Sequence, residues 1–585
     1  MPSAEEEAQF RARPQHSPLA SQRAREQREQ EANREREQRQ AGGRFANLFP
    51  LGYKDGFSQW WTSLKPAVAE HTVLSFVPHL QKPPTHAVTG SAPASCKTSK
   101  TNLTAQGQDA ADADATAEAL EAAASPSPSQ TTTDALSGDP YGPRRWNSTL
   151  VPLSGKNRSL NEFSVERLAD DAAAPKHTLV LLHGYGAGLA FFYRNFEALS
   201  RLPNWKLYAL DLPGMGRSSR PPFRIAARER DAKIDETESW FVDALEEWRV
   251  QRGIDKFVLC GHSLGGYLSV AYALKYPGRL EKLVLASPVG IPEDPYAVRE
   301  EMPESGESGM AENGFDHDDG LTVTDERGAV GSGTATPPRA GRAGADNNNF
   351  LNARSKAGGG GGGGDDDPNA PAPRKPLPKW LTYLWEANFV SPFSLVRWSG
   401  PLGPRLVSGW TTRRFAHLPP AEAQALHDYS YALFRQRGSG EYALPYILAP
   451  GAFARNPLIR RIDAVGRGYI DGPAAASASA SASASASASA GSLQRFERET
   501  GVPVVLMYGD HDWMDVAGGY AAADLLNERR RRALEEARSD EERGRERGGG
   551  KVVIIREAGH HVYLDGADQF NEVMLEEMRE TEKGR

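Results

Sequence analysis

The chain has 585 residues, of which 39% are hydrophobic and 25% are charged, and its formal net charge at pH 7 is −7. This acidic balance gives no reason to expect a nucleic-acid partner, since binding to nucleic acid favours a basic surface. The two cysteines, Cys96 and Cys260, lie far apart and Cys260 falls inside an apolar run, so we expect no disulfide framework and a reducing compartment.

The start of the chain carries no pattern typical of export or membrane insertion. No apolar run reaches the roughly 18 residues that suggest a membrane-spanning helix, and the first residues lack the apolar stretch of a secretory signal. The N-terminus is rich in arginine but interleaved with glutamate, whereas transit peptides are poor in acidic residues. Residue patterns alone therefore predict an intracellular protein and do not support a mitochondrial presequence.

Four segments have compositions that predict disorder, because they cannot bury enough apolar surface to offset the entropy lost on ordering. They are a polar tail (1–43), a linker rich in Ala, Ser, Thr and Asp (84–138), an insertion with seven consecutive glycines (296–375) and an insertion that alternates Ala and Ser (467–495). The segments between them have the side chains needed to pack.

The first of these packing segments is residues 44–83. Four of its apolar side chains share one face of a predicted helix by their spacing, namely Phe57, Trp60, Trp61 and Leu64. Pro66 then predicts a break or a second helix start. Because tryptophan favours the headgroup region of a membrane, we interpret the segment either as an interfacial anchor or as a helix packed on the domain.

From residue 139 onward the pattern changes to short apolar runs separated by helical stretches. The runs are "TLVLL", "KLYAL", "FVLC", "LVLA", "VPVVLMY" and "KVVII". Continuous apolar runs of this length are typical of parallel strands buried on both faces. Strands that alternate with helices predict an α/β fold with a mostly parallel sheet, built from residues 139–295 and 496–585. Residues 376–466, rich in Trp, Tyr, Phe and Leu, can pack between these two parts.

The stretch "FVLCGHSLGGYLSV" carries the strongest chemical signal. It contains G-x-S-x-G at residues 261–265, directly after a predicted strand and at the start of a predicted helix. That context is required of a nucleophile elbow, in which glycines permit a strained turn and the serine stands above the sheet edge. We therefore predict that Ser263 is a nucleophile.

A serine hydroxyl needs an adjacent base, and in this arrangement an acid follows the serine in the chain and a histidine comes last. The stretch "VPVVLMYGDHDWMD" offers three acids, Asp510, Asp512 and Asp515. We favour Asp512, which lies three residues beyond Gly509 and so reaches far enough into the loop. Asp515 remains the alternative.

The last strand supplies the predicted base. In "KVVIIREAGHH", His560 follows Gly559 where the chain leaves the strand. The neighbouring His561 would more naturally point to the opposite side or to solvent. The order of serine, acid and histidine favours His560 as the base over a structural histidine.

An oxyanion hole needs amide donors that are in place before the charge develops. The amide of Leu264, just after the serine, is one candidate. The loop "LVLLHGYGAG" supplies the second, for which we predict the amide of Tyr185, with Gly184 as the alternative. The sequence gives no reason to expect a metal ion or another cofactor.

Several stretches together resemble a known group of α/β-hydrolase-domain lipid enzymes. They include "HGYGAG", "DLPGMGRSSRP", "GHSLGGYLSVAYALKYP", "SPFSLVRWSGPLGPRLV", "YGDHDWMD" and "GHHVYLD". The group contains lysophospholipase-like hydrolases of N-acylethanolamine phospholipids, the related lipolysis co-activator, and fungal cardiolipin-specific deacylases and lysophosphatidate acyltransferases. The likeness covers residues 55–80, 145–295, 376–466 and 496–585.

The resemblance adds to the reading of individual residues. In this group the working histidine begins an H-x-x-x-x-D motif, and only His560 has an aspartate at that offset, Asp565. Some relatives lack an aspartate matching Asp512 but keep one matching Asp515, so both acids stay open. The co-activator has no serine at the elbow, so Ser263 favours an enzyme.

The resemblance also implies an α/β-hydrolase fold in which residues 376–466 form a helical lid over the pocket. Its aromatic and aliphatic side chains suit acyl chains. Five lid arginines could face anionic phosphate groups, or could be ordinary surface residues: Arg397, Arg405, Arg455, Arg460 and Arg461.

We therefore expect an intracellular, peripheral membrane serine hydrolase of lipid esters. The resemblance implies a phospholipid or lysophospholipid substrate, cardiolipin first, and a mitochondrial location, with cytoplasm or lipid droplet as alternatives. One alternative function is an acyltransferase that uses acyl-CoA and lysophosphatidate. Another is a non-catalytic scaffold on a lipid surface that recruits a lipase.

Overall fold

The computed structural model describes residues 49–62, 64–78, 80, 141, 144–167, 175–299, 302, 391–470 and 497–584. The predicted disordered tail and linker lie outside these residues, as do most of the two low-complexity insertions and the first 15 residues of the predicted lid, 376–390. The first insertion begins later than predicted, because Pro295–Arg299 forms helix α10.

Eight strands form one mixed sheet in the order β1-β2-β4-β3-β5-β6-β9-β10. Their bounds are β1 (Arg144–Pro152), β2 (Ser159–Arg167), β3 (His177–Leu182), β4 (Trp205–Leu210), β5 (Phe257–His262), β6 (Leu280–Ala286), β9 (Pro503–Gly509) and β10 (Gly549–Ile555). β1 pairs with β2 and β2 with β4 in antiparallel fashion, and every pairing from β4 to β10 is parallel. The predicted α/β fold with a mostly parallel sheet is confirmed.

All six apolar runs singled out in the sequence are strands of the parallel part. β1 and β2 were not predicted, because β1 lies at the edge of the sheet and alternates buried with exposed side chains instead of forming one apolar run. The carboxyl ends of parallel strands meet at one edge of a sheet, which is where open α/β folds bind ligands. The loops after β3, β5, β9 and β10 therefore converge on one region.

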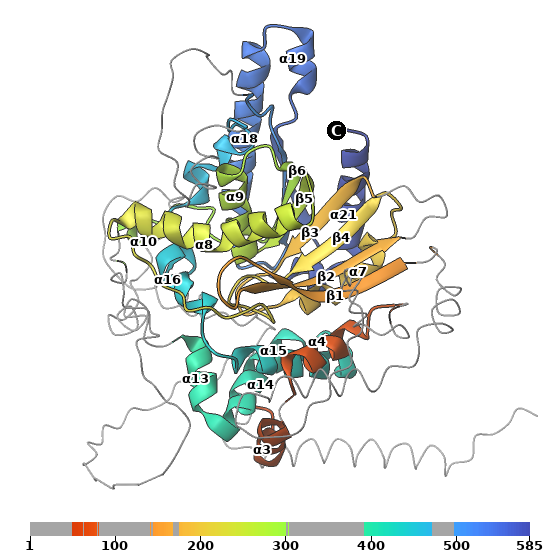
Figure 1. The fold of residues 1–585 in the computed structure, drawn as a ribbon, viewed down its shortest axis with the longest axis vertical. Helices are drawn as coiled ribbons and strands as arrows, with labels where there is room; N and C mark the ends of the chain where they lie inside the picture. The colour runs from red at the N-terminus through yellow and green to blue at the C-terminus, as the bar shows by residue number, and fades with distance from the viewer. Residues whose placement is uncertain are drawn as a thin grey trace, which may run out of the picture.

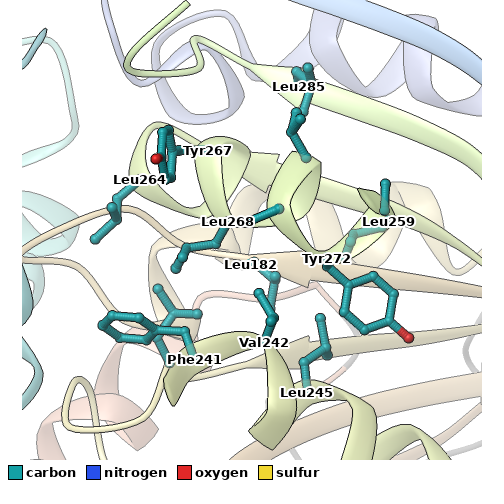
Figure 2. Packing of buried hydrophobic residues seen from close by; sticks show 14 of the residues in the cluster. Leu182, Phe241, Val242, Leu245, Leu259, Leu264, Tyr267, Leu268, Tyr272 and Leu285 are labelled. Carbon is teal, nitrogen blue, oxygen red and sulfur yellow. The ribbon is translucent and has the colours of Figure 1, made fainter. Parts of the chain in front are cut away.

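Two hydrophobic clusters cover the two faces of the sheet. Along β3, Val180 and Leu182 point into one cluster and Leu179 and Leu181 into the other. On the first face lie α8 (Arg230–Gln251), α9 (Leu264–Lys275) and α18 (Val516–Glu536), and on the second lie α7 (Tyr193–Leu199), α20 (Val562–Asp565) and α21 (Ala567–Glu582). Figure 2 shows side chains of α8 and α9 packed together with side chains of the strands.

The described part of the predicted lid is helical over its first half. Its helices are α13 (Pro392–Trp398), η2 (Gly400–Leu402), α14 (Gly403–Arg414) and α15 (Pro420–Phe434). The second half has η3 (Gly440–Ala443), α16 (Leu444–Ile447), the hairpin of β7 (Leu448–Ala449) and β8 (Phe453–Ala454), η4 (Leu458–Arg460) and η5 (Ile462–Ala464). Side chains from Tyr442 to Val465 join the first hydrophobic cluster, whereas side chains from Val407 to Phe434 join the second.

The N-terminal segment forms two helices, α3 (Tyr53–Thr62) and α4 (Pro66–Leu74), so the second start predicted at Pro66 is confirmed. α4 is packed: Ala69, Glu70, Val73 and Leu74 are buried, and the helix runs beside α15 under the sheet (Figure 1). α3 contacts η2 and α14 but leaves most of its surface exposed. Among the described residues, no helix is long and apolar enough to cross a membrane.

Candidate active site

Ser263 lies at the turn between β5 and α9. Its backbone has φ 52° and ψ −114°, a strained conformation for a residue with a side chain. The turn is held by hydrogen bonds from the Ser263 amide to the Ala286 carbonyl (3.0 Å) and from the Val289 amide to the Ser263 carbonyl (3.2 Å). A Cβ atom on Gly265 would lie 2.6 Å from the His183 carbonyl oxygen, so the motif needs glycine there. This is the geometry of a nucleophile elbow.

The loops after β9 and β10 bring Asp512 and His560 together. Nδ1 of His560 lies 3.2 Å from Oδ1 of Asp512, whose side chain is fully buried. Burial alone would raise the pKa of Asp512, but the hydrogen bond and charge of His560, the Ser287 hydroxyl and the Met514 amide together lower this pKa below its ordinary value. An ionised Asp512 can therefore accept a hydrogen bond from the protonated Nδ1 of His560 and hold the imidazole in one orientation.

The other two acid candidates have different surroundings. Asp515 is exposed and lies at the N-cap position of α18. Asp510 accepts hydrogen bonds from the amides of Glu557 (3.0 Å) and Ala558 (3.1 Å), so it ties the two loops together. Of the three aspartates, Asp512 is the one that the structure brings to His560.

The loop after β3 lies directly against the elbow. A Cβ atom on Gly184 would be 2.9 Å from both Cβ of Ser263 and Nδ1 of His262. Leu264 is the first residue of α9, and the first amides of a helix have no acceptor within it. Of the predicted donors, Leu264 thus follows the serine directly, and Tyr185 follows the glycine that lies against the serine.

A sequence profile described as the alpha/beta hydrolase fold matches residues 177–360. A 1-acylglycerol-3-phosphate O-acyltransferase of Arabidopsis thaliana is 30% identical over 445 residues, which cover 75% of this chain and 73% of that protein. The chain belongs to the α/β-hydrolase family. This confirms the resemblance and the fold class expected from the motifs.

Two further relatives support the same family assignment. A probable 1-acylglycerol-3-phosphate O-acyltransferase of Oryza sativa subsp. japonica is 27% identical over 69% of this chain and 67% of its own length. The 1-acylglycerol-3-phosphate O-acyltransferase ABHD5 of Homo sapiens is 47% identical over 128 residues, which cover 22% of this chain and 34% of that protein.

In this α/β hydrolase, the second histidine does not point to solvent, so that part of the sequence-based expectation is wrong. His561 packs near Phe191 and His262, with ring centroids 6.1 Å and 4.9 Å away. Its Nδ1 accepts a hydrogen bond from Nε of Arg414 (2.9 Å). Burial, and then the positive charge of Arg414, hold the pKa of His561 well below its ordinary value, so this ring stays neutral.

Asp565 of the H-x-x-x-x-D motif braces the loop that carries His560. Its Oδ2 accepts a hydrogen bond from the Gly559 amide (3.1 Å), immediately before the histidine. Nη2 of Arg414 lies 3.0 Å and 3.1 Å from the two carboxylate oxygens, and Nε2 of His417 lies 3.4 Å from Oδ1. Sequence reasoning missed Arg414, because nothing in the linear chain pairs the end of α14 with this loop.

The predicted lid packs against the loop after β3 through aromatic rings. Tyr185 stacks on Phe393 of α13 with centroids 5.0 Å apart, and Phe393 stacks on Phe434 of α15 at 4.4 Å. The same residues line a small cavity whose lining also includes the charged side chains Arg220 and Glu441.

The five lid arginines are engaged within the chain, so the structure favours their ordinary structural role. Three form ion pairs: Arg397 with Glu441, Arg460 with Glu293 and Arg461 with Glu238. Arg405 donates to the Leu51 carbonyl, and Arg455 donates to the Pro445 carbonyl. In the described ranges, no cluster of His, Cys, Asp or Glu is arranged to hold a metal ion.

Proposed function

We propose that this α/β hydrolase is a serine hydrolase of lipid carboxylic esters. The observation that carries the proposal is the Asp512–His560 pair at the strand ends beside the strained Ser263 elbow. This constellation is the one used for nucleophilic acyl transfer, whatever the fold that carries it.

The proposed reaction proceeds in two balanced halves. His560 takes the hydroxyl proton of Ser263 while Oγ bonds to the ester carbon, and the Tyr185 and Leu264 amides stabilise the negative carbonyl oxygen. The ester C–O bond then breaks and His560 returns the proton to the leaving alcohol. An acceptor hydroxyl, deprotonated by His560, next attacks the acyl-serine; the bond between the acyl carbon and Oγ breaks, and His560 returns the proton to Ser263.

The acceptor hydroxyl decides the reaction class. With water the enzyme is a deacylase, and we propose a phospholipid such as cardiolipin as its substrate, in line with the resemblance of its motifs to fungal deacylases. With the hydroxyl of lysophosphatidate and acyl-CoA as donor it is an acyltransferase, in which the first half breaks the thioester C–S bond and His560 protonates the leaving CoA thiolate. The names of the plant and human relatives favour this reaction. Radiolabelled cardiolipin, and separately labelled acyl-CoA with lysophosphatidate, distinguish the two. The presence of Ser263 argues against a non-catalytic scaffold.

We expect Asp565→Ala to lower hydrolysis and transfer together, by roughly 10²-fold in kcat, because a displacement of about 1 Å at the base costs about that much. The reason is that Asp565 holds the Gly559 amide and Arg414. Rates with both labelled substrates check this. Asp568→Ala is the matched control, because Asp568 is an exposed aspartate three residues after Asp565. Loss of transfer with full deacylation would contradict the bracing role and would favour a separate acyltransferase site.

An exposed apolar surface next to the lid supports peripheral membrane binding. This lid-side surface consists of Phe57 and Trp61 of α3, Leu395 and Trp398 of α13, Leu402 of η2 and Leu406 of α14. Trp61 is 73% and Trp398 67% exposed, unusually high fractions for a side chain of this size. Contiguous apolar patches of this kind mark interaction sites, and tryptophan favours the membrane interface. We propose that it docks on a membrane, with mitochondrial membranes implied by the motifs and lipid droplets as the alternative.

We expect Trp61→Ala combined with Trp398→Ala to weaken binding to phospholipid vesicles by about tenfold or more, since each buried large apolar side chain contributes about 1.5–3 kcal/mol. Hydrolysis of a soluble short-chain ester should stay unchanged, because neither ring contacts the catalytic residues. Vesicle sedimentation measures the binding. Tyr520→Ala is the control, since this 51% exposed ring is on α18 at the other end of the molecule (Figure 1). Equal binding before and after would refute membrane docking.

A further inference from the structure

Four parts of the chain meet at one buried carboxylate, that of Glu70 on α4. Its Oε1 accepts a hydrogen bond from Nη1 of Arg217 (2.7 Å), in the loop after β4. Its Oε2 accepts from Nδ2 of Asn161 on β2 (2.9 Å) and from the Tyr429 hydroxyl on the lid helix α15 (3.4 Å). The N-terminal helix, the sheet, a loop and the lid therefore share one polar centre inside an apolar region.

A second carboxylate, Asp211, continues this network toward the elbow. Its Oδ2 accepts from Nδ2 of Asn161 and from the Arg217 amide, both at 2.7 Å. Its Oδ1 accepts from the Leu189 amide (2.7 Å) and lies 3.5 Å from Nε2 of His183. His183 and Leu189 are the two ends of the loop that contains Tyr185, so Asp211 is hydrogen-bonded to one end of that loop and lies beside the other.

The orientation of the Tyr185 amide follows from the protonation of His183. The Leu212 amide donates to Nε2 of His183 (3.0 Å), so the ring proton is on Nδ1, which donates to the Gly184 carbonyl (2.8 Å). In a trans peptide the carbonyl and the next amide point in opposite directions. Holding the Gly184 carbonyl on one side therefore turns the Tyr185 N–H to the other side.

We propose that Glu70 is a positioning residue for the loop from His183 to Leu189, which carries the Tyr185 amide of the oxyanion hole. Helix α4 is in this sense part of the active site. Glu70 holds Asn161 and Arg217, and these in turn hold Asp211, which accepts a hydrogen bond from the Leu189 amide at the end of the loop. Without the Glu70 carboxylate, Arg217 loses the side-chain partner that fixes it, and the loop loses its anchor. The proposal rests on the proposed function, because the loop matters for rate only when an acyl oxyanion forms there.

The network also predicts a dependence on pH. Burial raises the pKa of Glu70 to about 7; Arg217 opposes this effect and Asp211 adds to it. The charged and titratable groups that face Glu70 are Arg217 and Asp211 from the loop after β4 and Tyr429 from α15, with His183 reached through Asp211. The ion pair with Arg217 is complete above this pKa and weakens as the pH falls through it.

Activity and stability should respond to this proton in opposite directions. Since the pKa of Glu70 is raised on folding, its contribution to stability is fully present below the unfolded value and is lost as the pH rises through about 7. Positioning of the loop, by contrast, needs the ionised form that is present above about 7. A loss of activity at lower pH therefore cannot be explained by a less stable fold at Glu70.

The test compares the full chain with its Glu70→Gln variant, which mimics the neutral carboxyl at every pH. We measure kcat for a p-nitrophenyl butyrate ester per active site titrated with a fluorophosphonate, so that unfolded protein does not count. The ratio of wild-type to variant kcat should be about tenfold or more near pH 8.5 and should approach one near pH 5.5, with KM changed by less than about twofold. Because His560 titrates in both proteins, its effect on kcat cancels in this ratio.

Thr72→Ala, on the solvent side of the same helix, is the control and should match the wild type at every pH. Glu70→Asp is the second variant in case Glu70→Gln does not fold. The ratio of wild-type kcat to Glu70→Asp kcat should change with pH in the same direction. A ratio that is constant with pH, or equal to one throughout, would overturn the proposal. Failure of the proposed function is distinguishable, because the wild type would then neither react with the fluorophosphonate nor hydrolyse the ester.

Discussion

Ser263→Ala should lower kcat for ester hydrolysis by roughly 10⁴–10⁶-fold, the loss found when a catalytic serine that works as a unit with its histidine is removed. The hydroxyl is the only group that the substitution deletes, and alanine meets the same backbone strain at φ 52° as serine does. The fold should therefore remain intact. Hydrolysis of a short-chain ester and the thermal unfolding midpoint of the purified variant measure the two effects.

Cys260→Ala is the matched control for this substitution. Cys260 is three residues before Ser263 and carries a nucleophilic side chain on β5, but it is fully buried and burial raises its pKa to about 12. It should therefore behave as a small core residue, and its removal should leave hydrolysis largely intact. Ester turnover by Ser263→Ala within tenfold of the wild type would refute the role assigned to the serine.

Asp512→Asn should lower kcat by about 10⁴-fold, because an asparagine at this position favours the wrong tautomer of the imidazole. The carboxylate is 3.2 Å from Nδ1 of His560, and its lowered pKa keeps it ionised where the histidine works. Measured against the same ester, Asp515→Asn should cost far less, since Asp515 is exposed at the start of α18.

The two variants also decide the choice that the sequence left open. Each substitution removes one negative charge and keeps the side-chain volume, so the difference between them reports the contact with His560. A larger loss for Asp515→Asn than for Asp512→Asn would reverse the assignment of the acid.

The parts of the fold that repeat a simple pattern could be predicted from the sequence. Parallel strands buried on both faces need continuous apolar runs, so six strands were visible, and the G-x-S-x-G turn between β5 and α9 was visible from its neighbours. The edge strand β1 was missed because only alternate side chains are buried. The sequence did not show that residues 407–434 and 442–465 pack in different clusters, because the two ranges are similarly apolar.

The candidate site likewise contains some residues that the sequence predicts and others that it does not. Ser263, Asp512 and His560 each follow a predicted strand, so the shared edge of a parallel sheet predicts that they meet. Arg414 and Glu70 come from a lid helix and an N-terminal helix, and their partners, Asp565 and Arg217, are about 150 residues away in the chain. No spacing rule reaches that far, and the raised pKa of Glu70 depends on burial that only the folded chain provides.

The most direct test of the central claim is to map the adduct that a fluorophosphonate forms with the full chain, by mass spectrometry of its peptides. The account predicts one adduct, on Ser263. It should be absent from Ser263→Ala and form far more slowly in Asp512→Asn, because the hydroxyl then lacks an oriented base. A wild-type protein that is folded yet acquires no adduct, or acquires it on a different residue, would contradict the account.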